Sequence, residues 1–293
     1  MEKLSKESSL TFQVSNHESE FPISDFLFLN SCFFKGVLVE SSTTGPKAIK
    51  GSVEAVKALK DANIPVRFVT NETQRTRKSL VAMLHSNGFE MSLEQVFPPC
   101  IAMASIIKSE KLNPYFLVHP NCMEDLLDGS SNAEDPQEDV EYDSVILGDA
   151  VEGFNYKNLN QAFQIIMKKS CPFYSLGLGK YYREDGDLTL DVGPFTKAIE
   201  FATDASPTII GKPSPHFFKS ALDDIGIKAE EALMVGDDIV SDVGGAQACS
   251  MSGVLVRTGK YRTTDENHPN VTPDKIVDNL ATIVKDLLKS AEI

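Results

Sequence analysis

Three carboxylates follow an apolar run near the C-terminal end of this chain. Asp237, Asp238 and Asp242 come directly after the run 232–235. Carboxylate oxygens are hard ligands that suit Mg²⁺, and acidic groups crowded beside a buried strand repel each other unless a cation is present. The alternative is that one carboxylate, with Asp242 the best candidate, caps the next helix while the others are solvated. The pattern therefore predicts a metal at Asp237, with Asp242 either supporting that site or capping a helix.

A lysine in a stiff loop could add a positive charge to such a site. The segment 211–215 reads GKPSP and lies between an apolar pair and a predicted helix. Its prolines restrict the backbone, so the loop could direct Lys212 toward a phosphoryl group or an acidic nucleophile. The alternative is an ordinary exposed lysine.

A third polar site follows the predicted strand 66–69, where Thr70, Asn71 and Glu72 begin the next segment. A hydroxyl beside the free N–H groups of a helix start suits a phosphate. The same residues would also serve as an ordinary helix cap, and the sequence leaves both interpretations open.

These residues must be positioned by an α/β fold, because short apolar runs alternate with amphipathic segments along the chain. We expect a Rossmann-like parallel sheet in a core built from residues 35–100 and 197–293. An inserted α/β cap would occupy 101–196, and 1–34 would be a disordered extension. The expected strands include 35–39, 66–69, 115–118, 144–147, 173–176, 232–235 and 253–256, and the expected helices 52–62, 75–87, 158–169, 215–225 and 242–248. Ligands bind at the carboxyl ends of such strands, so Glu40, Thr70 and Asp237 would share one pocket.

Composition limits the classes of partner. The chain has 293 residues, a net charge of −14 and a pI near 4.8, which argues against nucleic acid or an anionic membrane surface. No stretch approaches the roughly 20 apolar residues of a membrane span, and the N-terminus resembles no secretory signal. Five scattered cysteines without a CxxC pair predict reduced thiols in a cytoplasmic protein.

Taken in order, the strand-end threonine, the loop lysine and the GDDxxxD cluster resemble motifs two, three and four of the haloacid dehalogenase superfamily. The insertion resembles the larger α/β cap class (C2-type) of that superfamily. The stretches that carry a closer resemblance, to a branch that hydrolyses phosphoamide bonds and pyrophosphate, are KGVLVE, GSVEAVKALK, VRFVTNETQ, GKPSPHFFKSALDDIG, MVGDDIVSDVGGAQ, LDVGP and VRTGKYR. The resemblance implies an Mg²⁺-dependent phosphatase acting on phospholysine, phosphohistidine and inorganic pyrophosphate. It also implies a homodimer in the cytoplasm and also in the nucleus.

The resemblance also implies roles for individual residues. Lys212 would steady the charge on the nucleophile and the phosphoryl group. Asp237 would hold Mg²⁺, supported by Asp242. The phosphate contacts would come from Thr70, Asn71 and Glu72.

The first motif departs from the family pattern, Asp-x-Ser-Gly-Val. At the end of the expected strand 35–39 the chain has Glu40, with Ser42 at the serine position. Glu40 and Ser42 are therefore the candidate catalytic and metal-binding residues of this motif. Glu has one more methylene than the Asp of the family pattern, which moves the carboxylate by about 1 Å. A displacement of that size can lower the reaction rate about a hundredfold.

Three hypotheses follow from this departure. The chain is a phosphatase with an altered first motif, or it is a pseudoenzyme that binds phosphate without turnover. In the third, the first 44 residues are not the natural segment.

Overall fold

The computed structural model describes residues 27–31, 36–40, 45–127, 141–184 and 187–290. Its larger sheet has six strands in the order β14-β13-β12-β1-β4-β5, and every neighbouring pair is parallel. The strands are β1 Leu27–Ser31, β4 Val66–Val69, β5 Val96–Phe97, β12 Ala232–Gly236, β13 Ser252–Val256 and β14 Lys275–Val277. The predicted α/β fold with a parallel sheet is confirmed.

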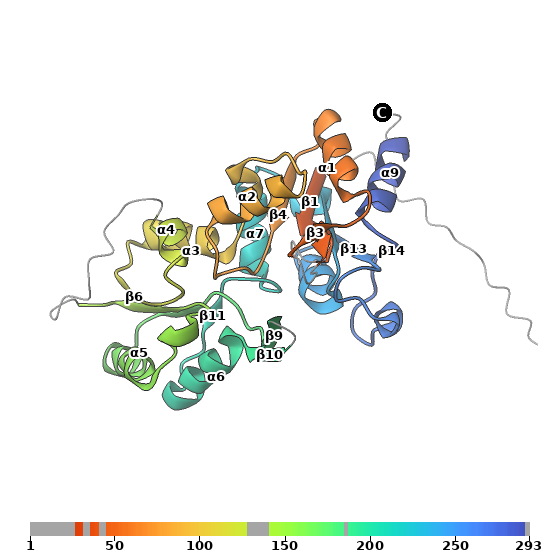
Figure 1. Cartoon of the computed structure of the whole chain (residues 1–293). Helices are drawn as coiled ribbons and strands as arrows, with labels where there is room; N and C mark the ends of the chain where they lie inside the picture. The colour runs from red at the N-terminus through yellow and green to blue at the C-terminus, as the bar shows by residue number, and fades with distance from the viewer. Residues whose placement is uncertain (1–26, 32–35, 41–44, 128–140, 185–186, 291–293) are drawn as a thin grey trace, which may run out of the picture.

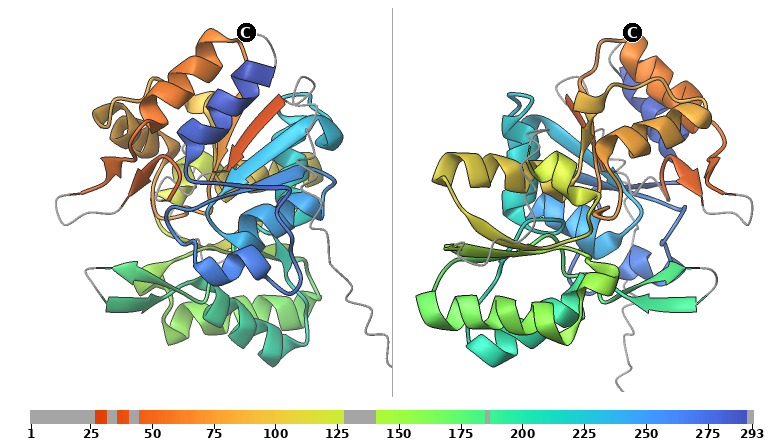
Figure 2. Two further views of the ribbon diagram at one scale, coloured as in Figure 1. Left: turned by 90° about the vertical axis from the view of Figure 1, so that its right-hand side faces the viewer. Right: turned by 60° about the vertical axis from the view of Figure 1, so that its left-hand side comes forward.

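Strand β12 is buried on both faces, as its apolar composition requires. Its alternate residues Leu233 and Val235 pack in one apolar cluster, and Ala232 and Met234 pack in another. Helices α1 Ser52–Asp61, α2 Arg77–Ser86 and α9 Leu280–Ser290 contribute buried side chains to the first cluster. Helices α7 Pro215–Asp223 and α8 Gly245–Gln247 contribute to the second. Figure 2 shows α1 and α9 side by side on their face of the sheet.

A smaller unit contains a four-stranded parallel sheet in the order β11-β8-β7-β6. Its strands are β6 Pro114–Leu117, β7 Ser144–Leu147, β8 Phe173–Ser175 and β11 Thr208–Ile209. Helices α5 Tyr156–Lys169 and α6 Val192–Thr203 lie next to each other on one face (Figure 1). A hairpin of β9 Tyr181–Glu184 and β10 Asp187–Leu190 projects from this unit (Figure 2).

Two further helices lie between the sheets. Helix α3 Pro99–Glu110 contacts both α7 and α4 Cys122–Leu126. Side chains of α3 and α4 share an apolar cluster with Ile146 of β7. A disulfide joins Cys100 to Cys122, with 6.4 Å between their Cα atoms, so the prediction of reduced thiols is wrong for this pair. The pairing joins residues 22 positions apart in sequence, which no spacing motif signals.

The prediction for the first strand is wrong. The central strand is β1, whereas Val39–Glu40 forms β2 and pairs antiparallel with β3 Lys47–Ala48 in a separate two-stranded sheet. Residues 37–39 are buried, which explains their apolar character, but burial alone does not make a strand of the main sheet. Because 27–29 and 37–39 are both short apolar runs, composition did not separate them.

The division into core and cap stays a prediction. Strand β11 pairs with β8, so residues 208–209 belong to the smaller sheet, beyond the expected cap end at residue 196. No helix in the described ranges has the length and apolar character needed to cross a membrane.

Candidate active site

The carboxyl ends of three adjacent strands define the candidate site. Strand β1 lies between β12 and β4, so the residues that follow those two neighbours flank the end of β1. These residues are Asp237 and Thr70, and each is about 1% exposed or less. The fold therefore brings the second and fourth sequence motifs to one edge of the sheet, because parallel strands have their carboxyl ends at the same edge.

Asp237 is a buried carboxylate with one unpartnered oxygen. Its Oδ2 accepts a 2.8 Å hydrogen bond from the backbone N–H of Lys260, while Oδ1 is buried and has no hydrogen-bond partner among the residues that the structure describes. Burial, and next the neighbouring carboxylate of Asp242, raise the pKa of Asp237 to about 7. An orphaned carboxylate oxygen is costly to bury, so a cation or a donor on a ligand would stabilise it.

Two glycines allow the backbone to approach this carboxylate closely. A Cβ atom added at Gly36 would lie 2.1 Å from Asp237 Oδ2, and one at Gly259 would meet the same oxygen at 2.1 Å. Both glycines have positive φ angles, of 125° and 60°. The hydroxyl of Thr258 donates to the carbonyl of Gly36, which ties the two loops together. The sequence interpretation placed Gly36 inside a strand and missed this role.

Lys212 and Asp242 form a fully buried ion pair. Lys212 Nζ lies 2.8 Å from Asp242 Oδ1, and both side chains are 0% exposed. The other oxygen of Asp242 accepts from the backbone N–H groups of Asp237 and Asp238, at 3.2 and 3.1 Å. Asp242 therefore supports the loop that carries Asp237, and it does not cap a helix.

Asn71 holds the backbone of the lysine loop. Its Oδ1 accepts from the N–H of Lys212 at 2.8 Å, and its Nδ2 donates to the carbonyl of Lys212 at 3.0 Å. This paired contact connects the second motif to the third. Asn71 is therefore linked to the site through the backbone of Lys212. Its contact with phosphate stays a prediction.

Thr70 and Glu72 form turns and do not start a helix. The hydroxyl of Thr70 accepts from the N–H of Glu72, and Glu72 Oε1 accepts from the N–H of Gln74. Helix α2 begins later, with Thr76 as its N-cap. The alternative of a helix cap at Thr70 or Asn71 is therefore wrong, and the helix dipole of α2 does not act at Thr70.

Asp238 and Lys260 complete the charged edge of the site. Asp238 is the N-cap of a π-helical turn, η5 Ile239–Gly244, and accepts from the N–H groups of Val240 and Ser241. Burial acts to raise its pKa, but the Ser241 N–H and the Lys260 ammonium outweigh this effect and hold the pKa below its usual value. Lys260 Nζ lies 3.3 Å from Asp238 Oδ2. The predicted helix 242–248 thus begins earlier than expected.

The structure does not bring the candidate Glu40 to this site as predicted. Glu40 is exposed on β2, which belongs to the separate two-stranded sheet. Its predicted position at the end of a central strand is wrong, so its proposed catalytic and metal-binding roles lose their structural basis. Ser42 lies outside the described residues.

The residues of this site fit a magnesium ion only in part. Asp237 offers one buried free oxygen, which is the kind of ligand Mg²⁺ takes. Within the described ranges, however, no group of three or more acidic, histidine or cysteine side chains could hold a metal. The donor set on these residues is therefore incomplete for a magnesium centre.

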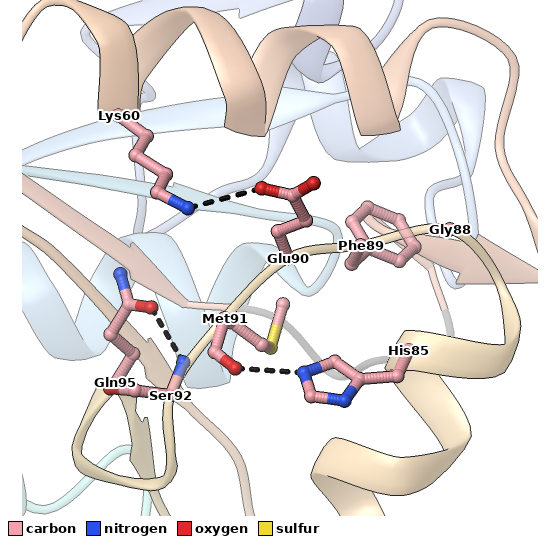
Figure 3. Close-up of a pocket in the computed structure, with 8 residues that line it drawn as sticks. All are labelled: Lys60, His85, Gly88, Phe89, Glu90, Met91, Ser92 and Gln95. Atoms are coloured by element: carbon pink, nitrogen blue, oxygen red, sulfur yellow. Dashed lines mark hydrogen bonds and ion pairs between the residues drawn. The ribbon is translucent and has the colours of Figure 1, made fainter.

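A surface hollow of about 700 Å³ lies apart from these motifs (Figure 3). Its polar groups bond one another: Lys60 with Glu90 at 3.1 Å, and a ring nitrogen of His85 with the carbonyl of Met91 at 2.8 Å. No residue of the predicted site lines this hollow, so its shape does not indicate the chemistry of the chain.

Two family models match the sequence. A haloacid dehalogenase-like hydrolase model matches residues 33–129, and a HAD-hydrolase-like model matches residues 209–283. The phospholysine phosphohistidine inorganic pyrophosphate phosphatase of Homo sapiens is 47% identical over 258 residues, covering 88% of this chain and 93% of the relative. The chain belongs to the haloacid dehalogenase-like hydrolase family. Haloacid dehalogenase-like hydrolase domain-containing protein 2 of Homo sapiens is 38% identical, covering 82% of this chain and 90% of that protein.

Solved structures agree with this haloacid dehalogenase-like fold. The 4-nitrophenylphosphatase of Thermotoga maritima superposes with a TM-score of 0.79 at 21% identity, covering 90% of this chain and 98% of that one. The p-nitrophenyl phosphatase of Archaeoglobus fulgidus gives a TM-score of 0.78 at 23% identity, covering 90% and 99%. At these identities the likeness concerns the fold.

Proposed function

We propose that this chain is a haloacid dehalogenase-like phosphatase whose substrates are phosphoamides, such as phospholysine and phosphohistidine, and inorganic pyrophosphate. The observation that carries the proposal is the buried Asp237 carboxylate with its free oxygen, beside the buried pair of Lys212 and Asp242. The names of the relatives at 45–47% identity support the substrate class.

The chain's own residues suggest how a phosphorylated ligand would be held. Lys212 supplies a buried positive charge next to the site, and Asn71 fixes the backbone that carries it. Thr70 lies buried at the end of β4. We include dependence on Mg²⁺ in the proposal because the free oxygen of Asp237 suits a hard cation.

The remaining parts of the proposal are a homodimer located in the cytoplasm and also in the nucleus, without a nucleic-acid or membrane partner. The net charge of −14 supports the absence of those partners. The homodimer and the location rest on resemblance.

A specific observation favours a second candidate, a phosphate-binding protein without turnover. Carboxylates can attack phosphorus to form an acyl phosphate, but the sequence from residue 27 to residue 39 contains no Asp or Glu. Aligning the Gly-Val pair of the family pattern with Gly36 and Val37 puts Phe33 at the position of the family's Asp. Gly36 supports this register because it lies against Asp237. Phe33 itself is outside the described residues.

One experiment separates the two candidates. Phosphate release from pyrophosphate and from phosphohistidine is measured with and without Mg²⁺, alongside calorimetric binding of pyrophosphate. Wild-type release that Asp237→Asn abolishes, and that the exposed-site control Glu40→Gln retains, supports the phosphatase. Binding without release, with release gained in Phe33→Asp, supports the second candidate. Sequencing the 5′ end of the transcript tests the hypothesis that the first 44 residues are not natural.

A further inference from the structure

The loop after β4 touches both units of the protein. On one side, Asn71 holds the backbone of Lys212 in the core. On the other, the N–H of Asp149, which follows β7 of the smaller sheet, donates to Thr73 Oγ1 at 3.4 Å. A shift of the smaller unit would therefore be transmitted to the segment that positions the buried lysine.

Gln74 is the residue where this loop makes its strongest contacts with the smaller unit. Its Nε2 donates to Asp149 Oδ2 at 2.7 Å and to the hydroxyl of Tyr182, on β9, at 2.9 Å. Its backbone carbonyl accepts from Asn121 at 2.9 Å. One glutamine thus joins the core loop to two segments of the smaller unit and to the start of α4.

The acceptor of this contact is itself held in place. Asp149 is 5% exposed, and its other oxygen accepts from the N–H of Val151 at 3.3 Å. Hydrogen bonds to a buried carboxylate are stronger than those between neutral groups. Losing the Gln74 amide would remove a donor from a carboxylate that little water can reach.

We propose that Gln74 is a positioning residue that fixes the smaller unit against the phosphate-site loop, so that ligand binding and cap position are coupled. Because the loop also holds Lys212, ligands that fill the site favour the arrangement that Gln74 stabilises. The identity of the ligand as a phosphorylated compound rests on the proposed function. The contact itself does not depend on that function.

The test uses amide hydrogen exchange and phosphate binding on the full chain. Gln74→Leu removes the donor at similar size, and Gln164→Leu on the exposed face of α5 is the matched control. We expect Gln74→Leu to speed exchange at residues 149–151 and 181–182 by about tenfold and to weaken binding of inorganic phosphate by a similar factor. Exchange in β12 should stay at the wild-type rate.

A reversed pair distinguishes positioning from a general loss of structure. Gln74→Glu places two carboxylates together and should have at least the effect of Gln74→Leu. Adding Asp149→Asn restores the hydrogen bond with its direction reversed, because the new amide donates and the carboxylate of Gln74→Glu accepts. The double variant should recover most of the protection from exchange and most of the phosphate affinity. Wild-type exchange and phosphate affinity in Gln74→Leu would refute the proposal, as would a double variant no better than Gln74→Glu alone. A wild type that binds no phosphate would count against the proposed function, while exchange would still decide the role of Gln74.

Discussion

Replacing Asp237 with asparagine should stabilise the protein at neutral and alkaline pH. The carboxylate is 0% exposed, and no group in the described part of the chain forms a hydrogen bond with its Oδ1. Asparagine keeps an oxygen to accept from the Lys260 N–H and carries no charge. The change therefore removes a buried charge while it retains the shape of the side chain.

The magnitude follows from the pKa of Asp237, which is raised from 3.8 to about 7 chiefly by burial and next by Asp242. Below pH 3.8 the carboxyl is protonated in both states and has no effect on stability. Between pH 3.8 and about pH 7 the folded state keeps a proton that the unfolded chain has lost, so the stability of the fold decreases as pH rises. Each pKa unit corresponds to about 1.4 kcal/mol, so the full cost above pH 7 is about 4 kcal/mol at most.

The assay is thermal or urea unfolding of wild type and Asp237→Asn at pH 4 and pH 8. The variant should gain several degrees at pH 8, up to roughly 10 °C for a chain of this size, and should differ little at pH 4. Added Mg²⁺ should raise the midpoint of wild type more than that of the variant, since ligands stabilise the state that binds them. A variant less stable than wild type at pH 8 would refute the reasoning, because it would mean that the charged carboxylate is well solvated or paired.

Three other substitutions test the surroundings of the site. Lys212→Met leaves Asp242 buried without its counterion and should lower the free energy of unfolding by about 3–5 kcal/mol. The same change at the exposed Lys57, which pairs with Asp61, should cost under about 1 kcal/mol, and equal losses in urea titrations would contradict the burial argument. Gly36→Ala, at φ 125° and with a Cβ 2.1 Å from a carboxylate oxygen, should cost about 1–3 kcal/mol, and unchanged stability would mean that the loop relaxes. Glu40→Gln should change stability by less than about 0.5 kcal/mol, whereas a large loss would show that this exposed residue has a partner.

Several elements were predictable from sequence because their boundaries carry strong local signals. Strands β4 and β7 occupy the predicted residues 66–69 and 144–147. Each is a short segment in which three of four residues are apolar and which a polar or glycine residue follows, and buried parallel strands have this pattern. Helix α1 likewise matches its apolar spacing to within one residue.

The buried contacts of the site were less predictable. The Lys212–Asp242 pair joins residues 30 positions apart, and the Gln74–Asp149 contact joins residues 75 apart. No local pattern identifies such partners, since the sheet order decides which loops meet. The motif GDDxxxD did indicate the carboxylates, but it did not indicate the partners of Asp242, whose oxygens contact Lys212 and backbone N–H groups.

Because the central strand is β1 and not 35–39, the position at which a nucleophilic carboxylate is expected changes. If Glu40 ended a strand of the main sheet, as the sequence predicted, the chain would have a carboxylate there that is one methylene longer than that of Asp. With β1 between β12 and β4, Glu40 does not end a strand of the main sheet, and the sequence from β1 to residue 39 contains no Asp or Glu. Changing Glu40 to Asp should therefore leave activity unchanged. A carboxylate introduced at Phe33 would instead lie between β1 and Gly36 in the sequence, and Gly36 lies against Asp237. The two substitutions distinguish an altered nucleophile from an absent one.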